Sequence, residues 1–115
     1  MAKQFIKKQP SRRKIILSTE FVASLERVKN YGEEMFGKTV SDRFISEIRR
    51  KISLLNQQPD IHPKNRFIES TEKKTYRNII HESYYILYSV TSTIIDIIEI
   101  YHSARSPEYV KTLVK

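Results

Sequence analysis

The chain has 115 residues, enough for one folded domain with its own hydrophobic core and too few for two. It has no cysteine, which excludes disulfides and thiolate zinc sites and fits a reducing cytoplasm, and no apolar run is long enough to cross a membrane. The formal net charge is +8, and six basic residues with no acid among them fall within the first 14 positions.

Residues 1–13 show neither helical nor strand periodicity, and Pro10 interrupts them. We therefore predict a basic, disordered leader over 1–13 and a single folded domain over 14–115. A solvated tail is one interpretation of the leader. The other is an arm that contacts a polyanion, because clustered lysine and arginine side chains release counterions from phosphate backbones.

The first elements of the domain are a short strand and a helix. Residues 14–18 form an apolar run that suits a strand, and Ser18 or Thr19 can cap the helix that follows. Apolar residues recur at helical spacing over 20–31, which predicts an amphipathic helix there.

Two glycines divide this helix from the next one. Gly32 is expected to end the first helix and Gly37 to mark a second break. Thr39 or Ser41 can cap a second helix, whose apolar face runs over about four turns. Two such helices form a hairpin, and their apolar stripes need a sheet to cover them.

The rest of the chain predicts that sheet. After a loop with two prolines and a polar turn at 69–74, three runs rich in β-branched and aromatic residues occupy 75–107, as in an antiparallel meander. Ser106 and Pro107 can start a short final helix. The predicted fold class is α+β with two layers: an N-terminal strand and a helical hairpin packed on a mainly antiparallel four-stranded sheet, in the order β-α-α-β-β-β with a short C-terminal helix.

Several short segments of the chain are weak signals on their own, but their order and spacing make a specific pattern when they are taken together. They are Ile15 to Phe21, Leu25 to Tyr31 with Phe36-Gly37, Leu54-Leu55 to Pro59 with Pro63, Tyr76-Arg77, Tyr84 to Tyr88, and Ile100 to Pro107. Over nearly all of residues 14–107 the chain thereby resembles the RelE/ParE toxins of type II toxin–antitoxin systems, also called plasmid-stabilisation proteins. The ending His102-Ser103-Ala104-Arg105-Ser106-Pro107 is closer to ParE.

The resemblance implies a cytoplasmic toxin that inhibits growth and is neutralised by a cognate antitoxin protein. ParE-like members act on DNA gyrase and are not nucleases, and this is the function we expect. RelE-like members are ribosome-dependent endoribonucleases that cut mRNA, and this alternative predicts a metal-independent enzyme. An alternative of another class is a nucleic-acid-binding module without toxicity.

If the chain is a nuclease, it needs a base, an acid and cations around the phosphate. The candidates for these catalytic roles are His102, Arg77 and Arg105. The residues predicted to bind the target or nucleic acid are Lys73, Lys74, Tyr76, Arg77 and Arg105. Structural alternatives are a hydrogen bond to a loop carbonyl for His102 and an ion pair with a nearby acid for Arg105.

Tyr85 bears on the choice between the two toxin types. The resemblance places it where RelE-like nucleases commonly carry an arginine in the third strand. A phenol cannot replace a guanidinium as a permanent cation, so this residue favours the ParE-like interpretation.

A basic stretch of the second helix, Arg49, Arg50 and Lys51, is predicted to contact the antitoxin, and the alternative is a solvated helix face. An acidic antitoxin segment that folds on binding would complement it. The three histidines, His62, His81 and His102, are irregularly spaced and do not suggest a metal site. We therefore expect no metal and no cofactor.

Overall fold

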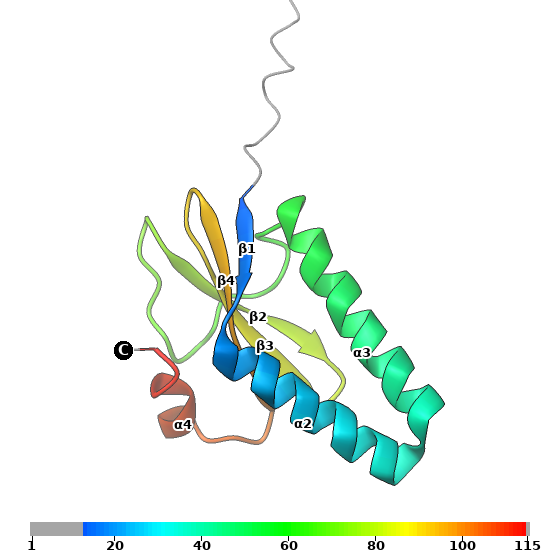
Figure 1. Cartoon of the computed structure of the whole chain (residues 1–115). Coiled ribbons are helices and arrows are strands. Elements are labelled where there is room, and N and C mark those ends of the chain that lie inside the picture. The colour runs from blue at the N-terminus through cyan, green and yellow to red at the C-terminus, as the bar shows by residue number, and fades with distance from the viewer. Residues whose placement is uncertain (1–12, 115) are drawn as a thin grey trace, which may run out of the picture.

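The computed structural model describes residues 13–114. The elements are, in chain order, β1 (Lys14–Leu17), α2 (Thr19–Phe36), α3 (Lys38–Ser53), a 3-10 helix (Leu54–Asn56), β2 (Thr75–His81), β3 (Tyr84–Val90), β4 (Ile94–His102) and α4 (Pro107–Lys111). One sheet has the order β1-β4-β3-β2, with β1 parallel to β4 and the other neighbours antiparallel (Figure 1). The predicted fold class is confirmed.

The predicted leader falls almost wholly outside the described residues. Only its last residue, Arg13, is described, and its Nε donates a hydrogen bond to the carbonyl of Thr91 at 2.7 Å. Within residues 13–114 no helix is long and apolar enough to cross a membrane.

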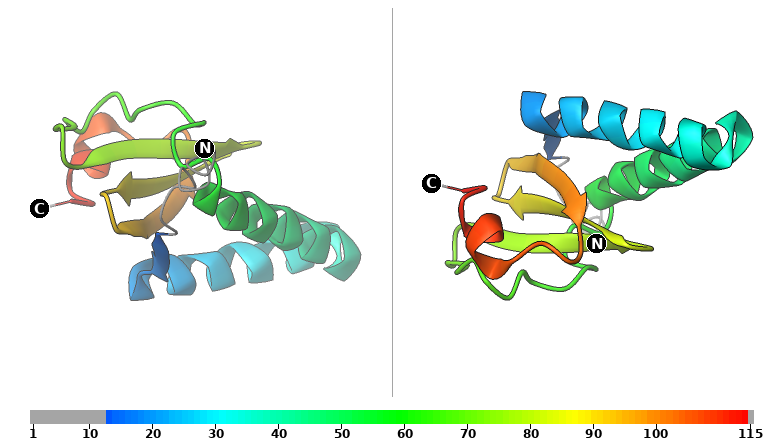
Figure 2. Two further views of the ribbon diagram at one scale, coloured as in Figure 1. Left: turned by 90° about the horizontal axis from the view of Figure 1, so that it is seen from above. Right: turned by 90° about the horizontal axis from the view of Figure 1, so that it is seen from below.

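The sheet has a different cover on each face (Figure 2). The hairpin of α2 and α3 covers one face, where buried residues from the helices and from β2, β3 and β4 form the larger core cluster. A smaller cluster on the other face joins Ile68, Leu87 and Tyr101 to Val110 of α4. The alternating pattern of β3 serves both cores, because successive side chains of a strand point to opposite faces.

Ser18 caps α2 as predicted: its Oγ accepts a hydrogen bond from the backbone N–H of Phe21 at 2.9 Å. The predicted end of this helix at Gly32 is wrong, because α2 continues to Phe36. Gly32 instead lets the two helices approach closely, since a Cβ there would lie 2.9 Å from Ser41 Oγ. Gly37, with φ of 93°, makes the turn between the helices.

The predicted caps of the second helix are also wrong. The N-cap position of α3 is Gly37, with no side-chain cap bond, and Thr39 lies inside the helix. Ser41 is buried, and its Oγ donates to the carbonyl of Lys29 in α2 at 2.7 Å. Its hydroxyl therefore joins the two helices instead of starting one.

The loop between α3 and β2 lies along the outer edge of β2. The N–H of Asn78 donates to the Pro63 carbonyl at 3.0 Å, and the N–H of Asn65 donates to the Tyr76 carbonyl at 2.8 Å. The Asn65 side chain also accepts from the N–H groups of Phe67 and Ile68. These bonds fix the path of the loop and cover this edge of the sheet.

Candidate functional site

Arg77 holds the loop that precedes its own strand. Its Nη1 donates to the carbonyl of His62 at 2.7 Å and to that of Asp60 at 3.3 Å. Its Nε lies 3.6 Å from Asp60 Oδ1, and the side chain is only 15% exposed. The guanidinium is therefore largely engaged with the loop.

His102 lies exposed at the end of β4. Its Nδ1 accepts a hydrogen bond from the N–H of Ala104 at 3.0 Å, and its ring meets that of Tyr84 edge-on, with centroids 5.7 Å apart. The predicted structural alternative named a loop carbonyl as the partner, but the partner here is a loop N–H. Because Nδ1 accepts, a neutral ring carries its proton on Nε2.

Arg105 stacks on an aromatic ring of α4. Its guanidinium carbon lies 3.5 Å from the centroid of the Tyr109 ring, a cation–π contact. Its backbone N–H donates to the carbonyl of His102 at 3.1 Å. Among the described residues its partner is thus an aromatic ring and not the acid that the structural alternative proposed.

The structure does not bring the three predicted catalytic side chains together. His102 is paired with Tyr84 on β3, whereas Arg77 is paired with Tyr88. These two positions on β3 are four residues apart, which corresponds to about 13 Å along the strand. Arg105 stacks on Tyr109, whose ring packs against the smaller core on the opposite face of the sheet from α2 and α3.

Lys73 and Lys74 lie exposed in the turn that leads into β2. The backbone N–H of each lysine donates a hydrogen bond to Thr71 Oγ1. The ammonium of Lys74 lies 5.9 Å from the centroid of the Tyr76 ring, which packs against the smaller core. The structure therefore brings Lys74 and Tyr76 together, away from His102.

Tyr85 is partly buried and packs against the smaller core. Its ring is perpendicular to that of Tyr101, with centroids 5.8 Å apart. It points away from α2 and α3, on the face that α4 covers. Its packing against this core accounts for a tyrosine at position 85.

A groove of about 580 Å³ runs between α2, α3 and β1. Its walls include exposed apolar side chains, Leu17 and Val22, and three charged residues, Glu26, Lys29 and Arg49. Lys29 is paired with Glu33 of the same helix at 3.0 Å. We call it the α2–α3 groove. Arg49 is the only one of the three predicted antitoxin-binding residues that lines it.

The neighbours of Arg49 lie elsewhere. Arg50 is exposed, and the ammonium of Lys51 donates to the carbonyl of Ile80 at 3.2 Å, which ties α3 to β2. Beside the α2–α3 groove, β1 pairs with β4 on one side only, and no strand among residues 13–114 pairs with its other edge. An apolar groove and an open strand edge therefore lie next to one another.

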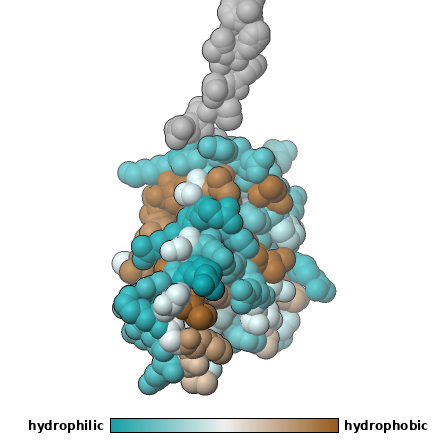
Figure 3. Space-filling view, turned by 90° about the vertical axis from the view of Figure 1, so that its right-hand side faces the viewer, coloured by the Kyte–Doolittle hydropathy of each residue, from teal (hydrophilic) through white to brown (hydrophobic). Residues whose placement is uncertain are grey.

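A second groove, of about 890 Å³, lies between the far end of the helical hairpin and the turn after β2. We call it the hairpin-tip groove. It is lined by aromatic side chains including Phe36, Phe44 and Tyr84, and also by His102. Figure 3 shows apolar surface among hydrophilic residues on the side of the molecule beside α3, including its lower end near the turn between the helices.

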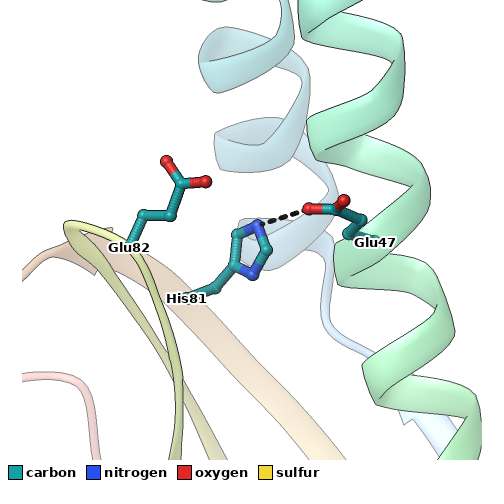
Figure 4. A group of neighbouring side chains, drawn as sticks. All are labelled: Glu47, His81 and Glu82. Carbon is teal, nitrogen blue, oxygen red and sulfur yellow. Dashed lines mark ion pairs between the residues drawn. The ribbon is translucent and has the colours of Figure 1, made fainter.

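Three potential metal ligands, Glu47, His81 and Glu82, lie close together (Figure 4). Two of them, Glu47 and Glu82, line the hairpin-tip groove. The sequence did not predict this cluster, because Glu47 is far from the other two along the chain. The adjacency of His81 and Glu82 at a strand end was the only local signal.

Burial shifts several pKa values in the domain. It lowers the pKa of His62, and the nearby cations Lys51 and Arg77 lower it further. It likewise lowers the pKa of His81. Burial raises the pKa of Tyr88, whose hydroxyl donates to the Pro59 carbonyl at 2.8 Å. None of these groups belongs to the predicted catalytic set.

One family model matches the chain, and two solved structures share its fold. The profile described as "ParE toxin of type II toxin-antitoxin system, parDE" matches residues 15–107. A solved structure from P. aeruginosa, titled "Chromosomal ParDE TA system", is similar with a TM-score of 0.64 and 13% identity, over 79% of this chain and 96% of that one. The archaeal RelE-RelB complex from Pyrococcus horikoshii OT3 is similar with a TM-score of 0.56 and 16% identity, over 84% of this chain and 100% of that one. No curated protein sequence matched.

Proposed function

The chain belongs to the ParE toxin family of type II toxin–antitoxin systems, and on that premise we propose that it inhibits growth by acting on DNA gyrase and is neutralised by a cognate antitoxin. The family match covers the whole folded domain up to the start of α4. The two structural likenesses are below the identity at which more than the fold can be transferred. The proposed target is therefore supported by the separation of the candidate catalytic groups, and the proposed antitoxin by the α2–α3 groove.

The observation that carries the choice of target is the separation of the candidate catalytic groups. RNA cleavage without a metal needs an acid or base and a cation around one phosphate. In this fold His102 and Arg77 are separated by about 13 Å along β3 alone. Moreover, Arg77 directs its Nη1 to loop carbonyls. Both facts favour a toxin that acts by binding over one that cleaves mRNA.

The α2–α3 groove supports the antitoxin part of the proposal. Leu17 and Val22 expose about half of their surface there, 48% and 51%. An amphipathic segment can bury them, and an acidic residue of that segment would face Arg49, because Lys29 is already paired with Glu33. The open edge of β1 beside the groove offers backbone groups to an added strand. We therefore expect an acidic antitoxin segment that orders itself on binding.

Inducible expression in a bacterial host tests the target. We expect growth to stop with DNA damage and filamentation. We also expect a neighbouring gene to encode a short acidic antitoxin whose co-expression restores growth. Growth arrest with mRNA cut at ribosomal A-sites would contradict the gyrase proposal and support the RelE-like alternative. Harmless expression would contradict toxicity itself and leave a binding module.

A pair of matched variants tests the antitoxin groove. Val22→Glu places a charge on the apolar wall, and we expect at least about tenfold weaker antitoxin binding, because burying an unpaired carboxylate is costly. Ile61→Glu is the control, since Ile61 is 62% exposed and does not line the groove. Both should retain the wild-type melting temperature. Equal antitoxin affinity for the two variants would place the antitoxin on another surface.

A further inference from the structure

Three side chains that can bind a metal converge where α3 faces the turn between β2 and β3. Glu47 comes from α3, His81 is the last residue of β2, and Glu82 follows it in the turn. One ligand atom from each lies within 4.8 Å of the other two. Figure 4 shows the His81 ring facing Glu47, with Glu82 on its other side. We propose that Glu47, His81 and Glu82 form a binding site for a divalent cation of the zinc class.

His81 is the central donor of this site. Its side chain is only 6% exposed, and its Nε2 is buried without a hydrogen-bond partner in the described part of the chain. Buried polar atoms are nearly always paired, so an unpaired one that points into a cluster of carboxylates calls for a ligand. A neutral imidazole nitrogen is a common ligand of zinc.

The spacing of the donors fits one ion better than it fits a hydrogen bond. His81 Nε2 lies 3.4 Å from Glu47 Oε1, which is long for a hydrogen bond. Two ligands that each lie about 2.1 Å from a tetrahedral zinc ion are about 3.4 Å from each other. The pair already has this separation, and an ion between the two atoms would satisfy both.

Glu82 completes the set from an exposed position. Its carboxylate has to approach the other donors by at most about 1.4 Å, because 4.8 Å is the upper limit of the cluster and about 3.4 Å is the ligand spacing. An exposed side chain makes such a shift by rotation alone. The residue has φ of 55°, as the two-residue turn between β2 and β3 requires.

The surrounding charges limit how tightly the cation binds. The positive charges of Lys51 and Arg50, both from α3, oppose the negative charges of the two glutamates at His81. Arg43 lines the hairpin-tip groove beside them. Lys51 is drawn away by its bond to the Ile80 carbonyl at 3.2 Å. Three protein ligands leave the fourth position of a tetrahedral ion open towards the hairpin-tip groove, as in open zinc sites.

Such an ion would tie α3 to the β2–β3 turn. Because the three ligands converge only in the folded chain, the cation stabilises the fold by mass action. At a hundredfold excess over its dissociation constant, zinc should raise the melting temperature by roughly 10 °C.

Titration of the untagged full chain with ZnCl₂ after treatment with EDTA tests the proposal. Calorimetry should show one zinc ion bound per chain, and the melting temperature should rise with zinc concentration. MgCl₂ should do neither, because magnesium demands octahedral oxygen ligands. Glu82→Gln, an exposed substitution that leaves the core untouched, should weaken zinc binding at least about tenfold, as should Glu47→Gln.

Two control variants separate this site from general binding to surface residues. Glu69→Gln removes an exposed acid elsewhere, and His102→Gln removes the histidine that lines the hairpin-tip groove. Both should bind zinc as the wild type does. The proposal is overturned if zinc produces neither heat nor a melting shift, or if Glu82→Gln and Glu47→Gln bind zinc as tightly as the controls.

Discussion

Replacing Gly32 by alanine should destabilise the domain, although alanine is the better helix former. The substitution gains about 1 kcal/mol of helix propensity. The added Cβ, however, would lie 2.9 Å from Ser41 Oγ and 3.2 Å from Ser41 Cβ. Ser41 is 3% exposed and donates to the Lys29 carbonyl at 2.7 Å, so moving it aside breaks a bond worth about 1 kcal/mol. With overpacking at about 1–3 kcal/mol, the expected net loss is about 1–3 kcal/mol.

Urea unfolding measures this loss as a midpoint lowered by about 1 M. In a Ser41→Ala background the penalty of Gly32→Ala should shrink by at least about 0.5 kcal/mol, which a double-mutant cycle detects. Glu34→Ala, on the exposed surface of the same helix, is the control and should stay within about 0.5 kcal/mol of wild type. A Gly32→Ala chain as stable as wild type would refute the close contact between the helices.

Three further substitutions test the loop and its neighbours. Arg77→Met should lower the free energy of unfolding by about 2 kcal/mol, because loop carbonyls lose a charged donor, and urea unfolding measures it. Asn65→Ala should cost about 2–3 kcal/mol in the same assay, since it leaves two N–H groups without their acceptor. The pKa of His62 is lowered by burial, so its contribution to stability is complete above about pH 6.5 and is lost as the pH falls. His62→Gln should therefore reduce the loss of unfolding free energy between about pH 7 and pH 5, measured with EDTA present; an unchanged profile would contradict the shift.

The meander and the first helix cap were predictable because their causes are local. The dense run of β-branched and aromatic residues that forms β3 is visible in the sequence. Ser18 caps the helix that it directly precedes. The predicted end of the first helix at Gly32 is wrong because a glycine is needed there for a tertiary contact and not for a helix end. The residue that requires a glycine there is Ser41, on the facing helix.

The candidate site was less predictable for the same reason. Arg77 stands out in the sequence as a polar residue in an apolar strand, but its partners belong to a loop without periodicity. The irregular spacing of the histidines gives no sign that His81 could be a metal ligand. Its neighbour Glu47 comes from another layer of the fold, which no local spacing reveals. The groove beside β1 likewise exists only once the helices pack on the sheet.

The most direct test of the central claim is a supercoiling assay with purified DNA gyrase and the full chain. The proposed function predicts that the chain inhibits supercoiling in a dose-dependent manner, and that prior binding of the antitoxin abolishes the inhibition. Gyrase that keeps full activity at a chain concentration that causes cleavage of ribosome-bound mRNA would contradict it.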